Sequence, residues 1–186
     1  MDILAAFGLS ASAGLNAYIP LLVVSLLAKF TDLIKLSEPW SAMESWWIIG
    51  LLIVLSTVEF VADKVPAVNH VNDAVQTLVR PTAGAILFAA SANVITDISP
   101  VLSIAAGLLI AGSVHVVKSV AIRPAVTATT AGMGDVPVSI VEDVVSTSVS
   151  LLSVIFPVVI GVLMLLLAIW IIWWLMQRNK RARSQM

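Results

Sequence analysis

The chain has 186 residues, of which 60% are hydrophobic and 11% are charged, and its mean hydropathy is +1.05. A typical soluble domain carries roughly 25% charged residues, so this composition indicates an integral membrane protein. The chain has no Cys, which excludes disulfides, thiolate metal sites and a cysteine nucleophile. We expect a single membrane domain over residues 1–186, with the lipid bilayer as its partner and no nucleic-acid partner.

Five segments approach the length of about 20 mostly apolar residues that a membrane span needs. They are residues 4–29, 46–64, 81–97, 101–121 and 151–176.

Polar and breaking residues predict how these spans deviate from straight helices. Asn16 and Pro20 predict a kinked or interrupted first span, and Pro157 predicts a kink in the fifth. Ser99-Pro100 predicts a tight hairpin between the third and fourth spans. The expected fold is therefore all-α, a polytopic membrane helix bundle of about five transmembrane helices.

The basic tail at residues 177–186 predicts the orientation. It holds four of the ten basic residues, so the positive-inside rule places the C-terminus in the cytoplasm. With five spans, the N-terminus is then outside, and the connection with Lys29 and Lys35 is cytoplasmic. All six Trp residues lie next to these cytoplasmic ends, as expected for an interfacial belt.

A polar motif occurs twice in this apolar sequence, at Asp63–Thr77 and at Asp135–Thr147. Both copies read Asp, Val-Pro, a small polar residue, Val, an acid, Val and Thr. The match indicates an internal duplication with approximate halves 1–80 and 81–176, and chance similarity is the alternative. The number of spans places both copies on the non-cytoplasmic side, where they can meet.

The motif segments have valines at three- and four-residue spacing. This spacing predicts two amphipathic helices, over residues 66–80 and 135–150, that are either interfacial or re-entrant. The small-residue tract Thr127–Gly134 precedes the second helix. Irregular backbone of this kind is tolerated at membrane depth only where protein or a water-filled cavity surrounds it.

Three stretches carry a family resemblance: Glu59–Pro66, Thr129–Gly134 and Ser139–Asp143. They resemble domain-of-unknown-function family 4126, which consists of small bacterial membrane proteins, and the resemblance runs from about Leu9 to the final span. Two departures are an Asn at position 69, where the family usually has Asp, and Gly-Asp-Val-Pro from Gly134, where it has Gly-Asn-Pro. The resemblance implies a multi-pass protein of the bacterial inner (plasma) membrane and no particular activity.

Charged residues are expensive inside a membrane, so those within or beside the spans are candidates for a substrate- or ion-binding site. The candidates are Asn16, Glu59, Asp63, Lys64, His70, Asp73, Arg80, His115, Lys118, Arg123, Thr130, Asp135, Glu142 and Asp143.

Each group of candidates has an ordinary structural alternative. Glu59 and Asp63 share one helix face, and Asp63 either pairs with Lys64 or Arg80 or serves as a functional carboxylate. The adjacent acids Glu142 and Asp143 cannot share a helix face, so one is expected to point inward while the other caps or is solvated.

The basic candidates have alternatives of the same kind. Lys118 either snorkels outward or neutralises a buried acid. Arg80 and Arg123 either clamp an anionic group or balance Asp63, Asp73, Glu142 and Asp143. The Pro residue that follows each of these Arg residues predicts a helix break.

A metal site is the least specific of these expectations. Glu59, Asp63, His70 and Asp73 could together ligate a divalent cation, but an interfacial His70 bound only by hydrogen bonds is the more usual explanation of the pattern. No cofactor and no catalytic residue is predicted.

Three functions remain open on the sequence alone. A small transporter or channel, for a cation or a proton-coupled small solute, follows from duplicated halves, interrupted helices and converging charges, and five spans suggest a homodimer. A membrane scaffold or partner-binding subunit needs only the amphipathic outer face. A membrane enzyme that acts on a lipid or headgroup would use paired acids and His70, although the sequence shows no nucleophile or metal signature.

Overall fold

The computed structural model describes residues 3–64, 66–92 and 99–183, and these residues form helices and connections with no strand. Residues 66–70, 92, 168, 171, 172, 174, 175 and 178–183 are described by their backbone alone. The elements in chain order are α1 (Ile3–Leu15), α2 (Tyr18–Phe30), the 3₁₀-helix η1 (Trp40–Glu44), α3 (Trp46–Ala62), α4 (Pro66–Ala92), α5 (Pro100–Val116), the π-helix η2 (Val117–Ile122), α6 (Arg123–Thr130), α7 (Asp135–Ile155) and α8 (Pro157–Arg183).

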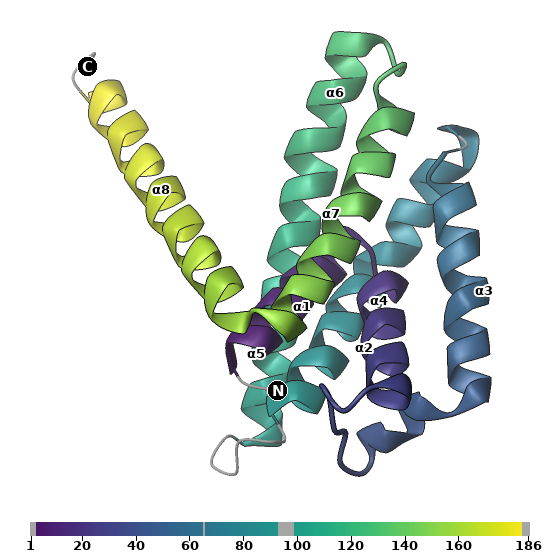
Figure 1. The fold of residues 1–186 in the computed structure, drawn as a ribbon. Helices are drawn as coiled ribbons and strands as arrows, with labels where there is room; N and C mark the ends of the chain where they lie inside the picture. The colour runs from purple at the N-terminus through teal and green to yellow at the C-terminus, as the bar shows by residue number, and fades with distance from the viewer. Residues whose placement is uncertain (1–2, 65, 93–98, 184–186) are drawn as a thin grey trace.

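Helix α1 crosses the middle of the bundle, where it contacts α4, α5, α7 and α8, while α2 packs against α3 and α7 (Figure 1). Helix α3 runs toward the end of the bundle that is uppermost in Figure 1, and α4 returns from it. The continuous run α5–η2–α6 rises to the same end, and α7 returns from it. The two helices that contain the repeated motifs thus start at one end of the bundle, as the sequence predicted.

The predicted interruption of the first span is confirmed. Helix α1 ends at Leu15, and α2 begins at Tyr18 and runs back in the opposite direction (Figure 1). Asn16 stabilises the break, because its Oδ1 accepts hydrogen bonds from the amides of Tyr18 and Ile19 at 3.1 and 3.0 Å. An Asn side chain can in this way satisfy amides at the start of a helix that have no intrahelical partner.

The predicted break at Arg80-Pro81 is wrong. The first motif segment and the third predicted span form one helix, α4, and Pro81 lies inside it. The division between residues 80 and 81 therefore cuts a helix rather than separating two halves. Helix α4 packs along α5, in agreement with the predicted hairpin, and part of the connection between them lies outside the described residues.

The predicted break at Arg123-Pro124 is also wrong. The chain stays helical from Pro100 to Thr130, and the change at Arg123 is from the π-helix η2 to the α-helix α6. Pro124 lies in the first turn of α6, where a missing amide hydrogen is easily tolerated. The chain then turns at Ala131 and Gly132, whose φ angles of 52° and 85° are left-handed. This turn is largely exposed at the end of two helices.

The boundary between the second motif and the fifth span also differs from the prediction. Residues 135–150 do not form a separate interfacial helix, because they continue to Ile155 as α7. The break comes at Phe156, before Pro157, so the expected interruption occurs but divides α7 from α8. By length and composition, two of the described helical runs could cross a membrane: Pro100–Thr130 and Asp135–Ile155.

The motif helices are amphipathic with their polar faces turned inward. In α4, Val71 and Val75 are 66% and 53% exposed, whereas Gln76 and Arg80 are buried. In α7, the buried positions are Ser139, Glu142, Asp143, Ser146, Ser150 and Ser153. Val141 and Val145 in α7 are likewise exposed, whereas Val79 in α4 is partly buried against the core.

Small residues allow the helices to approach closely. A Cβ atom added at Gly14 would lie 2.6 Å from the Ala111 carbonyl oxygen, and one added at Gly84 would lie 2.8 Å from the Gly107 carbonyl oxygen. These positions accept only Gly because the backbone of the neighbouring helix occupies the space of a side chain. The small residues of α1 and α4 thus bring both helices into close contact with α5.

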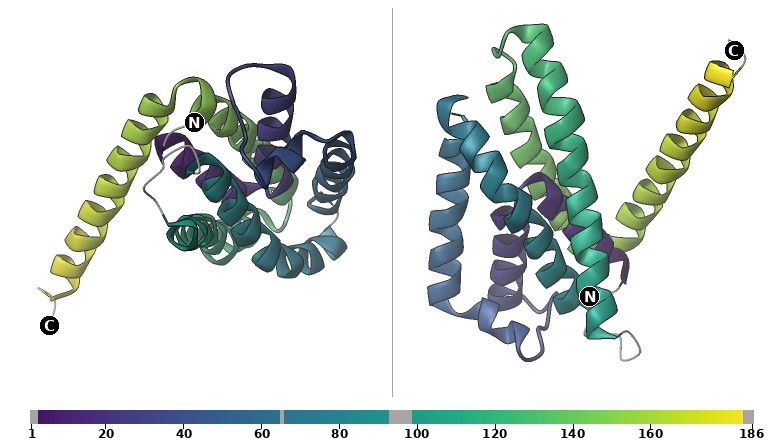
Figure 2. Two further views of the ribbon diagram at one scale, coloured as in Figure 1. Left: turned by 90° about the horizontal axis from the view of Figure 1, so that it is seen from below. Right: turned by 180° about the vertical axis from the view of Figure 1, so that it is seen from behind.

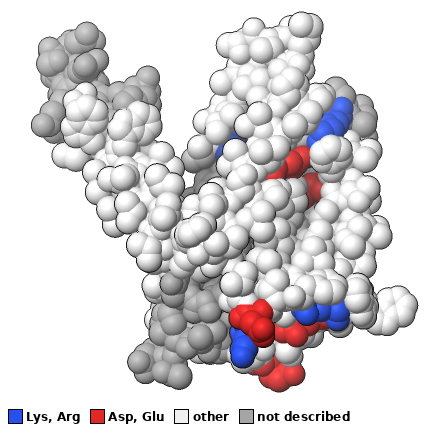
Figure 3. All heavy atoms as spheres, viewed as in Figure 1, with Lys and Arg blue, Asp and Glu red and all other residues white. Residues whose placement is uncertain are grey.

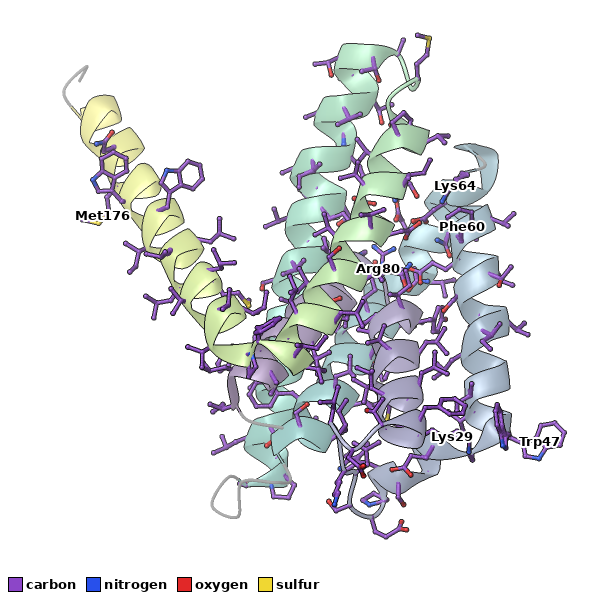
Figure 4. All side chains as sticks on the ribbon, viewed as in Figure 1. Lys29, Trp47, Phe60, Lys64, Arg80 and Met176 are labelled. Carbon is purple, nitrogen blue, oxygen red and sulfur yellow. The ribbon has the colours of Figure 1, made fainter. Side chains whose placement is uncertain are left out.

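The six Trp residues do not lie at one end of the bundle. Figure 4 shows Trp47 at the lower end and Met176, close to Trp173, near the upper end of α8. Helix α8 leans away from the other helices, and its last turns lie at the end where α3 meets α4 (Figure 2). The orientation predicted from the number of spans rests on residues 4–29 forming one span, whereas α1 and α2 are two helices that run in opposite directions.

Candidate functional site

Ten ionisable residues gather between the helices near the end of the bundle where the motif helices begin. This charge cluster consists of Glu59, Asp63, Lys64, Asp73, Arg80, His115, Lys118, Arg123, Glu142 and Asp143. They come from α3 and the residues after it, α4, α5, η2, α6 and α7, so the site exists only in the folded bundle.

Asp63 lies at the centre of the charge cluster. Its Oδ2 is 2.9 Å from an Arg123 nitrogen, 3.8 Å from Arg80 and 4.0 Å from Lys118. Its Oδ1 accepts a 2.6 Å hydrogen bond from Asn72 Nδ2. Asp63 thus pairs with Arg80 but not with Lys64, the other partner that the sequence allowed.

Arg80 connects a carboxylate to a histidine in the fully buried part of the cluster. Its guanidinium donates to Glu59 Oε1 at 2.9 Å and to His115 Nδ1 at 3.1 Å. The other ring nitrogen of His115 is 3.2 Å from Thr77 Oγ1, which itself donates to the Asp73 carbonyl. These contacts fit a neutral His115 that accepts at Nδ1 and donates from Nε2.

Lys118 lies in the π-helix η2 and points into the bundle. It is 1% exposed, and its Nζ is 2.9 Å from Glu142 and 2.8 Å from the carbonyl oxygen of Leu15. Lys118 therefore neutralises a buried acid and does not snorkel outward. It also binds the last carbonyl of α1, where a cation is favoured by the helix dipole. Short π-helical turns are frequent at functional sites.

Asn16 connects the break between α1 and α2 to the charge cluster. While its Oδ1 caps α2, its Nδ2 donates to Asp143 Oδ1 at 3.0 Å. Both ends of the interrupted helix pair thus contact the cluster, one through Lys118 and the other through Asn16.

The adjacent acids Glu142 and Asp143 are both buried and both paired, contrary to the expectation that one would be solvated. Glu142 Oε2 contacts Lys118 and Arg123 at 2.9 and 3.0 Å, and Asp143 Oδ2 contacts Lys64 at 3.2 Å. Both acids fall on the single buried face of α7, whereas Val141 and Val144 on its other side are each 59% exposed, so each acid can find a partner in the interior.

The charge cluster reaches the surface beside α7. Figure 3 shows acidic and basic atoms together in a hollow between α7 and α3. The pocket at this place has a volume of about 360 Å³ and is lined by Ile19, Phe60, Asp143, Val144, Thr147 and Ser148.

The described ionisable groups of the cluster do not balance. Five carboxylates face four cations, and His115 is neutral, so the cluster carries a net charge of −1 with every carboxyl group ionised. Within the described part of the chain, Glu59 Oε2, Asp73 Oδ1 and Glu142 Oε1 are buried without a hydrogen-bond partner. A buried carboxylate oxygen of this kind favours the uptake of a proton or a cation.

Two predicted site residues do not join the charge cluster. Thr130 and Asp135 lie at the turn between α6 and α7, where Thr130 Oγ1 accepts from the Gly134 amide and Asp135 accepts from Thr127 Oγ1. The side chain of His70 is outside the described residues. No group of three His, Cys, Asp or Glu residues among those described could hold a metal ion.

Sequence reasoning missed Asn72, Gln76 and Thr77 as contributors from α4. Asn72, Gln76 and Arg80 recur every four residues, so they share one helix face. This polar stripe is visible in the sequence, where it lies beside the stripe of Val71, Val75 and Val79 on the same helix. The contact made by the Leu15 carbonyl has no sequence signal, because any residue supplies a carbonyl.

The comparison with protein families matches residues 3–178 to the family described as a domain of unknown function (DUF4126). The chain belongs to this family. For this DUF4126 member, no curated protein and no solved structure matches. The family assignment confirms the resemblance predicted from the acidic motifs, and the function has to be argued from the charge cluster.

Proposed function

We propose that this DUF4126 member is a polytopic protein of the bacterial inner membrane that transports a cation or a proton-coupled small solute. Exposed apolar side chains cover the long helices while a cluster of ionisable groups is buried between them, the reverse of the usual arrangement in a soluble domain. Such an arrangement is stable where the surroundings are apolar, which supports the membrane assignment.

The end of the bundle near the charge cluster is assigned to the cytoplasm. The last turns of α8, which carry the basic tail, lie at this end (Figure 1), and Lys64 lies there too (Figure 4). The opposite end has Lys29 and Lys35 but also Asp32, Glu38 and Glu44. The positive-inside rule therefore favours a cytoplasmic opening of the cluster, the reverse of the side expected from sequence.

The observation that carries the transport proposal is the break between α1 and α2, with both of its ends bound to the charge cluster. Interrupted helices whose ends contact substrate or coupling ions near the middle of the membrane are a recurrent feature of secondary transporters. Lys118 at the end of α1 and Asp143 near the start of α2 take the corresponding places here. The net charge of −1 leaves room for one proton or one monovalent cation.

Ion flux into liposomes tests this proposal. The purified protein is reconstituted, and proton entry is followed with an enclosed pH dye under an imposed potential, with radioactive sodium uptake measured in parallel. We expect flux above that of protein-free liposomes, at least a tenfold reduction in Glu142→Gln and Asp143→Asn, and no change in Asp32→Asn, which removes an exposed acid at the other end.

Two results would overturn the transport proposal. One is the absence of proton and sodium flux in the unaltered protein under every gradient. The other is flux that Glu142→Gln and Asp143→Asn leave intact, because the cluster would then serve only structure.

A further inference from the structure

The hollow beside α7 contains a positive group bound in a defined way. Lys64 follows the end of α3, and its ammonium is 3.2 Å from Asp143 Oδ2, 3.1 Å from the Phe60 carbonyl oxygen and 3.2 Å from the centroid of the Phe60 ring. Figure 4 shows Lys64 and Phe60 together at this end of α3. A carboxylate, a carbonyl and an aromatic face are together the groups that recognise an ammonium ion.

The Phe60 carbonyl is left free by the way α3 ends. In a continuing helix it would accept from the amide of Lys64, but that amide bonds to the Val61 carbonyl at 3.1 Å. The terminal carbonyls of a helix need outside donors, and here the Lys64 side chain is the donor.

Lys64 is held less firmly than the other cations of the cluster. Its side chain is 18% exposed, whereas those of Arg80 and Lys118 are 0% and 1% exposed. It also lies past the last residue of α3 and can turn away without disturbing a helix. The pocket of about 360 Å³ adjoins Phe60 and Asp143 and is otherwise lined by Ile19, Val144, Thr147 and Ser148.

We propose that this pocket binds a small primary amine whose ammonium group replaces that of Lys64 on Asp143 and Phe60. In the absence of such an amine, the ammonium group of Lys64 itself occupies the binding site. The inference deepens the proposed transport function by naming the substrate class, and it rests on that function, although binding is measurable without transport.

Chemical replacement of the lysine side chain tests this inference. Lys64→Ala removes three carbon atoms and an ammonium group, the same set of heavy atoms that n-propylammonium supplies, so this ion is the matched probe. Binding is measured calorimetrically in zwitterionic lipid nanodiscs at constant ionic strength. We expect n-propylammonium to bind Lys64→Ala at least about tenfold more tightly than it binds the unaltered protein, because the competing lysine ammonium has been removed.

Two further probes separate the contributions of charge and of hydrogen bonding. n-Propanol has a similar shape without charge, and n-propyltrimethylammonium has the charge without N–H donors. Both should bind Lys64→Ala at least about tenfold more weakly than n-propylammonium. Equal binding of all three would overturn the inference, since the pocket would then be only an apolar hollow.

Lys29→Ala is the matched control variant. The Lys29 ammonium also meets a carbonyl, that of Glu44 at 2.8 Å, and an aromatic ring, that of Trp46 at 4.6 Å. No ion pair joins it to a carboxylate among the described residues. Lys29→Ala should therefore bind n-propylammonium like the unaltered protein, and a gain equal to that of Lys64→Ala would overturn the inference.

A second substitution tests whether Phe60 and Asp143 bind the amine. Adding Phe60→Leu to Lys64→Ala should weaken n-propylammonium binding about threefold to tenfold, and adding Asp143→Asn should abolish it. If Lys64→Ala does not remain monodisperse, Lys64→Ser, whose unbranched side chain ends at the position of the lysine Cγ, is used in its place with ethylammonium. No gain in amine affinity in the variant that folds would overturn the inference.

Failure of this inference differs from failure of the transport proposal. Cluster-dependent proton flux without n-propylammonium binding removes the amine assignment alone. Amine binding with the expected variant pattern, but without flux of protons, sodium or the amine in liposomes, removes transport and leaves a binding site.

Discussion

The two halves of helix α4 are packed in opposite ways. The first half presents Gln76 and Arg80 to the interior, and the second half presents Gly84, Leu87 and Phe88. The polar half is stabilised by directional contacts with particular partners, so it is sensitive to the loss of one group. The apolar half is stabilised by close fit, so it is sensitive to added volume.

The largest expected effect comes from removing a cation in the polar half of the interior. Arg123→Met leaves Asp63, Glu142 and Asp73 without a guanidinium that lies 2.9, 3.0 and 3.7 Å from them. We expect the free energy of unfolding to fall by about 3–5 kcal/mol, because uncompensated buried carboxylates remain. Reversible unfolding in mixed detergent–SDS micelles measures it.

Arg123→Lys is the control, since it keeps the charge and should lose less. A decrease of less than about 1 kcal/mol in the free energy of unfolding of Arg123→Met would contradict the inference that directional ion pairs stabilise the polar part of the interior.

The apolar half should be broken by added volume. A Cβ at Gly107 would lie 2.7 Å from Phe88 Cβ and 2.8 Å from Ala85 Cα, so Gly107→Leu forces α4 and α5 apart. We expect a loss of about 1–3 kcal/mol in the same unfolding measurement. Gly50→Leu is the matched control, because nothing lies within 4 Å of a Cβ there. Equal effects of the two substitutions would contradict close packing between α4 and α5.

An uncharged polar contact should show an intermediate sensitivity. Ser12 Oγ is 2.9 and 2.7 Å from the hydroxyls of Ser146 and Ser150, and all three residues are buried. We expect Ser146→Ala to lower the free energy of unfolding by about 0.6–1.7 kcal/mol, the range for hydrogen bonds between membrane helices. Ser148→Ala, on the exposed face of α7, should have almost no effect, and a larger effect there would reverse the assigned faces.

The smallest effect is expected at the other end of the bundle. Lys29 lies over the Trp46 ring, with its Nζ 4.6 Å from the centroid, and it is partly exposed. Lys29→Ala should cost about 0.5–1 kcal/mol, as for an exposed cation–π contact. Lys35→Ala is the control, and it should cost less than Lys29→Ala because Lys35 is exposed. A loss of stability in Lys29→Ala as large as that in Arg123→Met would contradict the inference that the effect of removing a cation depends on its position in the bundle.

Much of the helical content and of the site could be predicted from sequence. The break after Leu15 was visible as Asn16 inside an apolar run, and the acidic motifs identified Glu59, Asp63, Glu142 and Asp143 as neighbours. These predictions held because a charge in an apolar segment needs a partner, whatever the fold.

The predictions that failed depended on long-range contacts. Pro81 and Pro124 predict helix breaks, yet α4 and the run from α5 to α6 continue through them, since packing against other helices outweighs one missing hydrogen bond. Residues 4–29, which the sequence predicts as one span, form α1 and α2 in opposite directions, and the sides predicted for the later connections rest on that single span.

The sequence by itself determined which residues are too polar to face an apolar surrounding, and therefore that this chain hides a charged interior. Only the tertiary structure decided which charges pair, that Lys64 and not Arg80 lies against Asp143, and that a pocket opens beside them. The physical reason is the separation of the interacting residues along the sequence. Polarity and helix periodicity are properties of a single segment, whereas an ion pair between residues 64 and 143 forms only when separate helices pack together.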